Sequence, residues 1–115
     1  MAKVITDSVS IAANTRNPDV LSGKRNALIS NRGEGAAIAI YSTGSAIGLF
    51  METFVGEDSV VERSAVNIQN RVPVVPDDIV VSRVAGLPND RITMPVENTT
   101  GGALTFFYRV EVEDL

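Results

Sequence analysis

The sequence has no histidine, no cysteine and no tryptophan among its 115 residues. Histidine is the commonest general base, histidine and cysteine are the commonest zinc ligands, and cysteine is the strongest side-chain nucleophile. Without cysteine there is also no disulfide framework. These absences favour a structural role over catalysis. We therefore expect no enzyme activity, no cofactor and no metal site.

Long apolar segments are missing as well. The longest purely apolar run, residues 36–41, is far shorter than a membrane-spanning helix. The first residues lack the apolar stretch of a signal peptide. From these features we expect a soluble protein that is made in the cytoplasm and does not contact a membrane.

Aromatic side chains are scarce, so valine and isoleucine must supply most of the core, a bias that favours strands. The length fits one domain, residues 1–115, with a single hydrophobic core. The aromatic residues are Tyr41, Phe50, Phe54, Phe106, Phe107 and Tyr108.

Positive charge is also limited. The net charge of −4 argues against direct nucleic-acid binding, which needs a basic surface. The charge is uneven along the chain. Residues 1–35 carry five basic and three acidic side chains (+2), whereas residues 36–115 carry five basic and eleven acidic ones (−6). The two segments can pair within one copy, the interpretation we favour, or dock head to tail between copies.

Alternating apolar and polar residues predict short strands along the whole chain. In residues 4–11, Ile5, Val9 and Ile11 share one face. In the last strand, Val110 and Val112 lie opposite the charged side chains. The predicted strands cover residues 4–11, 24–31, 36–42, 46–55, 59–69, 76–85, 91–97 and 103–113.

Turn-forming residues separate these strands. The segment 14–23 is expected to be a loop, and residues 56–58 and 98–102 are expected to be turns. Residues 43–45 predict a tight hairpin between 36–42, which is apolar on both faces and hence central, and 46–55.

Three segments are less regular. In 59–69 we expect Val60, Val66 and Ile68 to point inward. Residues 76–85 suit a strand or a short helix that begins at a proline, and their β-branched content favours the strand. Pro95 interrupts 91–97 and predicts an edge strand.

About eight strands at a spacing of ten to twelve residues indicate an all-β fold. We predict an antiparallel β-sandwich of jelly-roll or similar Greek-key topology.

Several motifs bear on chemistry, and each has a simpler structural interpretation. The acidic pairs 57–58, 77–78 and 113–114 suit a calcium ion, but none has the spacing of a calcium-binding loop, so solvated turns are favoured. The glycines in 32–36 match neither phosphate-binding pattern. Residues 98–100 match the N-glycosylation pattern, and we interpret them as a turn. A Ser–Lys dyad needs Lys3 or Lys24, and neither lies in an evident core context.

The strands near the two ends of the chain are the candidate interfaces. Residues 106–108 place aromatic side chains on both faces of the last strand, so one face suits the core and the other suits either a neighbouring subunit or a cover from the same chain. Residues 1–11 or 103–115 are also expected to add a strand to an adjacent sheet. The candidate interface residues are Val4, Ile5, Val9, Ile11, Phe106, Phe107 and Tyr108.

The strand-rich chain, its polar loop at 14–23 and the Gly-Gly turn before the closing strand 103–113 resemble single jelly-roll coat proteins and capsid decoration (cement) proteins of viruses and phages. The resemblance is one of general character and carries over no functional residue. It implies a virion component made in the host cytoplasm, with protein partners: other copies of itself in a homo-oligomer, or a major capsid protein. Residues 1–16 hold only two basic side chains, which favours an outer position over contact with a packaged genome.

Two other classes compete with this interpretation. A sandwich that binds a carbohydrate or a receptor is disfavoured. Sugar sites use exposed aromatic platforms, and this chain has no tryptophan and only two tyrosines. A small hydrolase with paired carboxylates at Asp77 or Asp78 needs a substrate cleft that so short a chain barely accommodates.

Overall fold

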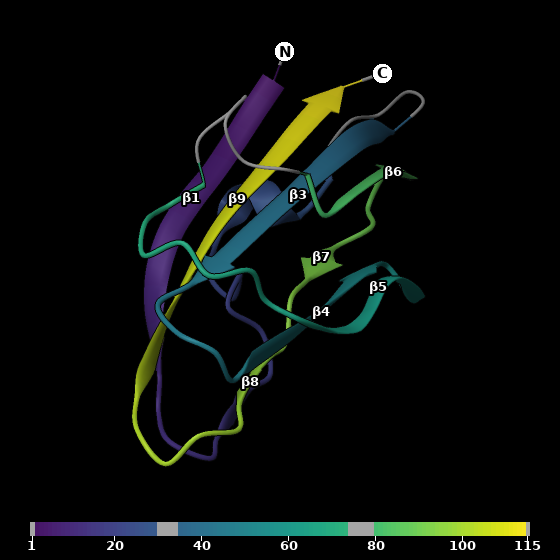
Figure 1. Cartoon of the computed structure of the whole chain (residues 1–115). Coiled ribbons are helices and arrows are strands. Elements are labelled where there is room, and N and C mark those ends of the chain that lie inside the picture. The colour runs from purple at the N-terminus through teal and green to yellow at the C-terminus, as the bar shows by residue number, and fades with distance from the viewer. Residues whose placement is uncertain (1, 30–34, 74–79, 115) are drawn as a thin grey trace.

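The computed structural model describes residues 2–29, 35–73 and 80–114. Strands dominate this part of the chain and form two antiparallel sheets packed face to face (Figure 1). The predicted all-β sandwich is therefore confirmed.

Sheet A contains four strands in the order β1-β9-β3-β6. Their bounds are β1 Ala2–Ile11, β9 Leu104–Asp114, β3 Ala36–Gly44 and β6 Ser82–Gly86. Figure 1 shows β1 and β9 side by side in purple and yellow, with the two chain ends at the same end of the sandwich. β1 pairs with β9 over ten residues, from Ala2 opposite Glu113 to Ile11 opposite Leu104.

Sheet B follows the order β2-β8-β4-β5, and β7 pairs with the far half of β4. Its strands are β2 Arg16–Asn17, β8 Val96–Asn98, β4 Leu49–Val55, β5 Asp58–Ala65 and β7 Ile92–Thr93. β7 and β8 both pair with β4 and are separated only by Met94 and Pro95. Pro95 has no N–H for the ladder, and the strand predicted at 91–97 is split at this point. β8 lies between β2 and β4, so the edge position predicted for 91–97 is wrong for this half.

The strand order is that of a jelly roll. β7 and β8 count here as one interrupted strand. The first strand then pairs with the last, the second with the second-last, and so on: β1 with β9, β2 with β8, β3 with β6, and β4 with β5. A long hairpin rolled into two sheets has these pairings. β3 lies between β9 and β6, so the central position predicted for 36–42 is confirmed.

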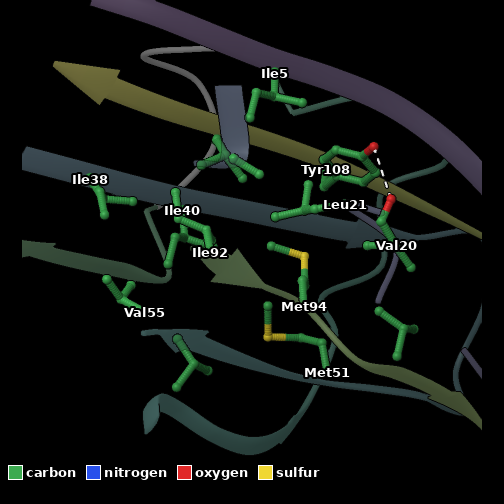
Figure 2. Packing of buried hydrophobic residues seen from close by; sticks show 14 of the residues in the cluster. Ile5, Val20, Leu21, Ile38, Ile40, Met51, Val55, Ile92, Met94 and Tyr108 are labelled. Atoms are coloured by element: carbon green, nitrogen blue, oxygen red, sulfur yellow. Dashed lines mark hydrogen bonds between the residues drawn. The ribbon is translucent and has the colours of Figure 1, made fainter. Parts of the chain in front are cut away.

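The core lies between the two sheets and consists mainly of isoleucine and valine, with methionine and two aromatic rings (Figure 2). Met51 and Met94 lie close together between the sheets, and Tyr108 donates a hydrogen bond to the Val20 carbonyl (3.4 Å). Ile38, Ile40, Val110 and Val112 project inward from sheet A. The β-branched bias therefore produces the core that the composition predicts.

One polar group of the core is unsatisfied. The Thr53 hydroxyl is fully buried in β4 and has no hydrogen-bond partner within the described ranges.

Four other local predictions are wrong. Residues 43–45 do not close a hairpin, because β3 and β4 lie in different sheets and residues 45–48 cross between them. The strand predicted at 24–31 is instead a short 3-10 helix, η1 (Arg25–Ala27), in its described part. The strand predicted at 59–69 ends at Ala65, and Ile68 is 49% exposed rather than inward. The loop at 14–23 contains the two-residue strand β2.

Other predictions hold. The turn at 56–58 is confirmed, and Gly56 has a positive φ of 62°, which glycine adopts without strain. β6 confirms a strand within 76–85, although residues 76–79 lie outside the described ranges. β9 confirms the long closing strand, with Arg109 and Glu111 on the face opposite Val110 and Val112. This strand is central in sheet A, between β1 and β3.

Candidate interaction surfaces

Most of the predicted interface residues belong to the core of the chain itself. Ile5, Ile11, Phe106 and Tyr108 are buried between the sheets, and Val9 packs against the same cluster. A partner reaches these side chains only if β1 or β9 leaves sheet A.

Val4 and Phe107 are placed differently. Both lie on the outer face of sheet A, where Val4 is 45% exposed and Phe107 is half-buried between Ser8 and Thr43. A contact through these two side chains stays a prediction.

Residues 66–73, which follow β5, cross the outer face of sheet A (Figure 1). Near the end of β3, Ile68 forms an isolated bridge with Gly44, and the Thr43 hydroxyl donates a hydrogen bond to the Arg71 carbonyl (2.6 Å). Tyr41 lies on this outer face and yet is only 2% exposed, and Pro73 is buried. We call residues 66–73 the crossing segment. It covers the part of this face near the end of β3.

Another part of the outer face of sheet A is hollowed. A groove of about 370 Å³ lies over β6, β3 and β9. Ala39 is flanked in register by Arg83 and Glu111, and Ala37 by Ala85 and Glu113. Small side chains thus form the floor, and charged side chains form the walls.

The outer face of sheet B is covered by its own side chains. Arg63 on β5 reaches over β4 to Glu97 on β8 (3.2 Å), with its guanidinium 4.1 Å from the centre of the Phe50 ring. Arg16 on β2 reaches over β8 to Glu52 on β4 (3.5 Å). Each arginine therefore spans one strand, and together the two ion pairs link all four strands of sheet B. We call these four side chains the arginine lattice.

The arginine lattice bears on the charge segregation in the sequence. Arg16 and Glu52 belong to the basic and the acidic segment, so these segments pair within one copy at this point. Lys24 and Asp7 pair within the first segment, and Arg63 and Glu97 pair within the second.

A buried amide organises the end of the sandwich that carries the 99–103 turn. The Asn98 side chain is 0% exposed and donates hydrogen bonds to the carbonyls of Ile11 (3.0 Å) and Gly102 (2.8 Å). Its carbonyl oxygen accepts hydrogen bonds from the Thr100 amide and hydroxyl. This geometry agrees with the turn interpretation of residues 98–100. A buried and fully bonded amide is not available for glycosylation while the fold is intact.

A charged pair lies at the exposed edge of β1. The Lys24 ammonium group donates a hydrogen bond to Asp7 Oδ2 (2.6 Å), and Asp7 Oδ1 accepts one from the Ser8 amide (2.8 Å). The bond from Lys24 lowers the pKa of Asp7, and the same bond raises the pKa of Lys24. Burial raises the pKa of the neighbouring Tyr108 hydroxyl. A lysine held in its charged form is a poor base or nucleophile, so a catalytic Lys24 is disfavoured.

The other sequence motifs are dispersed or lie outside the described ranges. Glu57 and Asp58 are exposed in the β4–β5 turn, and Glu113 and Asp114 are exposed at the end of β9. Asp77, Asp78 and most of the 32–36 glycine segment are outside the described residues. Within residues 2–29, 35–73 and 80–114, no group of three acidic side chains is placed to hold a metal ion.

Sequence reasoning missed the arginine lattice and the Asp7–Lys24 pair. Arg63 and Glu97 are 34 residues apart, and no local pattern links them. Asp19 had a readable signal, the Asn-Pro-Asp turn: its carboxylate accepts hydrogen bonds from the amides of Leu21 (2.9 Å) and Met94 (3.0 Å).

In the described part of the chain, no helix is long and apolar enough to cross a lipid bilayer. Comparison with known proteins gives no relative: no protein-family model matches the chain, and no curated protein sequence is significantly similar to it.

Proposed function

We propose that this protein is a non-enzymatic structural subunit of a viral or phage particle, either a coat protein or a decoration protein that binds the capsid lattice. The observation that carries the proposal is the jelly-roll strand order, in which the first strand pairs with the last and the others follow inward. Viral capsid subunits use this arrangement repeatedly, as do lectin domains and cupins.

The fold alone does not decide among these classes, so the choice depends on the side chains. Cupin-type chemistry relies on a metal, for which histidine is the commonest protein ligand, and the sequence contains no histidine. Sugar binding favours exposed aromatic platforms, whereas Phe50 lies beneath the Arg63 guanidinium and the sequence has no tryptophan. A packed interior and surfaces of charged and small side chains suit protein–protein assembly best.

The first experiment is the solution mass of the purified protein by light scattering, with electron microscopy of any large species. Shells, or discrete closed oligomers such as trimers and pentamers, support a self-assembling subunit. A monomer excludes self-assembly as the main role and leaves two candidates, a decoration protein and a ligand-binding sandwich.

A second experiment separates these two candidates. A decoration protein is expected to bind purified capsids of a matched virus and to give no signal on a glycan array. A specific glycan signal from the monomer contradicts the structural proposal.

A further inference from the structure

Among the strands of the described residues, β1 is the outermost of sheet A and pairs with β9 alone. An edge strand of ten residues presents a row of main-chain N–H and C=O groups that another strand can bind. Soluble β-proteins protect such edges with charges, bulges or covering segments. We therefore expect β1 to carry a feature of this kind that protects its free edge.

The hydrogen bonds show which residues face that edge. The N–H and C=O groups of one residue in an antiparallel sheet point to the same side of the strand, and successive residues alternate. The Ser45 amide donates to the Thr105 carbonyl, so Thr105 and, by alternation, Phe107 face β3 rather than β1. Ser8 lies opposite Phe107, and its amide donates a hydrogen bond to the Asp7 carboxylate. Ser8 therefore faces the free edge, and by alternation so do Val4, Thr6 and Ser10.

Asp7 stands at the centre of this edge. One carboxylate oxygen occupies the outward N–H of Ser8 (2.8 Å), and the other accepts the ammonium group of Lys24 (2.6 Å). Lys24 directly precedes η1, which packs beside β1 and so anchors the pair. An incoming strand loses one of its hydrogen-bond partners at Ser8 and must partly desolvate two opposite charges, which costs free energy.

We propose that Asp7, held by Lys24, closes the free edge of β1 against strand addition by the β1 of a second copy. A second β1 is the strand that fits best. In an antiparallel pair of β1 strands about a twofold axis, the main-chain groups of the outward-facing residues of the two copies bond to each other. The apolar row of Ile5, Val9 and Ile11 then continues from one copy into the other. The proposal concerns this edge alone and goes beyond the proposed function, because assembly through the faces or ends of the sandwich leaves it unchanged.

The test compares single variants of the full chain by light scattering, with amide exchange of residues 4–10 as a local readout. Asp7→Ala removes both the cap and the charge, and we expect the mass to double relative to the unmodified chain while these amides become protected. Asp7→Asn keeps an oxygen that can accept the hydrogen bond of the Ser8 amide, so this variant should associate less than Asp7→Ala. Glu57→Gln, which removes a charge from the exposed β4–β5 turn, is the matched control and should not change the mass.

A second substitution identifies the edge as the site of association. Thr6→Pro removes one outward N–H, which an edge strand tolerates, so Asp7→Ala combined with Thr6→Pro should return to the original mass. Lys24→Ala gives an independent test if Asp7→Ala does not fold, and we expect it to associate as well.

Two results overturn the proposal. The first is an unchanged mass with unchanged amide exchange in the folded Asp7 and Lys24 variants. The second is a lower mass for Thr6→Pro alone, because the edge would then already be in use in the unmodified protein.

Discussion

The two outer faces of the sandwich are closed in different ways. On sheet A, the crossing segment lies over the end of β3, and Tyr41 and Thr43 are each less than 10% exposed. On sheet B, no strand or loop is needed, because Arg63 and Arg16 extend across neighbouring strands to Glu97 and Glu52. One face is covered by main chain and the other by charged side chains.

The difference shows how position in the chain decides what covers a sheet. The chain passes from β5 in sheet B to β6 in sheet A, and the described part of this connection, residues 66–73, supplies a further layer near the end of β3. Such a layer stabilises by burying apolar surface. Exposed ion pairs contribute little, because water and salt screen them. We therefore expect unequal stability contributions from the two faces.

The largest effect should come from removing an aromatic ring on each face. Tyr41→Ala empties a buried site on the outer face of sheet A, and we expect a loss of about 3–5 kcal/mol of unfolding free energy, the usual range for a buried aromatic ring. Phe54→Ala on the outer face of sheet B removes a half-buried ring and should cost about 1–2 kcal/mol. Urea unfolding of both variants measures the difference. Equal losses would contradict the comparison.

A smaller effect should follow when the crossing segment loses its polar anchor. Thr43→Val keeps the shape but removes the hydrogen bond to the Arg71 carbonyl. We expect a loss of about 1 kcal/mol and faster amide exchange in residues 67–73, with no change in sheet B. Thr93→Val, a half-buried threonine on β7 of sheet B, is the matched control. Unchanged exchange in 67–73 would show that the hydrogen bond does not hold the segment.

On sheet B, the arginine lattice should contribute less still. Arg63→Ala removes the ion pair with Glu97 and the contact over Phe50, and we expect a loss of at most about 1 kcal/mol. The loss should shrink as salt is added, because the pair is exposed. Arg63→Lys keeps the charge but not the planar stacking and separates the two contributions. A loss as large as that of Tyr41→Ala would reverse the comparison.

The smallest effect concerns the Asp7–Lys24 pair at the edge of sheet A. The pKa of Asp7 is below its ordinary value of 3.8 in the folded protein because Lys24 bonds its charged form. Its contribution to stability is therefore complete above about pH 5 and is lost as the pH falls through the lowered pKa. Both side chains are exposed by more than a third, so we expect less than about 1 kcal/mol. Acid unfolding of the unmodified protein and of Asp7→Asn measures this difference.

Sequence patterns predicted the strands whose environment is simple. β1 and β9 have one buried face, so their alternation shows in the sequence, whereas β3 is buried on both faces from residue 38 to 44 and shows no such alternation. The pattern at 43–45 correctly indicated a change of direction but not its kind. Glycine and serine permit a turn within one sheet and a crossing between two sheets equally well.

The interaction surfaces were less predictable than the fold. The apolar residues named as interface candidates were mostly core, because burial in the chain and burial against a partner select the same side chains. The arginine lattice depends on register across three pairs of strands, and Asp7 depends on a lysine 17 residues away. Such pairs become visible only when the strand order is known.

The position of β9 has a consequence for folding during synthesis. β9 is the central partner of both β1 and β3, and it is the last strand of the sandwich to leave the ribosome. Until residues 104–114 have emerged, β1 has no partner in its sheet and must wait as an unpaired segment about a hundred residues upstream. Closing so long a loop is slow, so sheet A should form after sheet B has most of its strands. For the nascent chain, completion of the sandwich is a single late event.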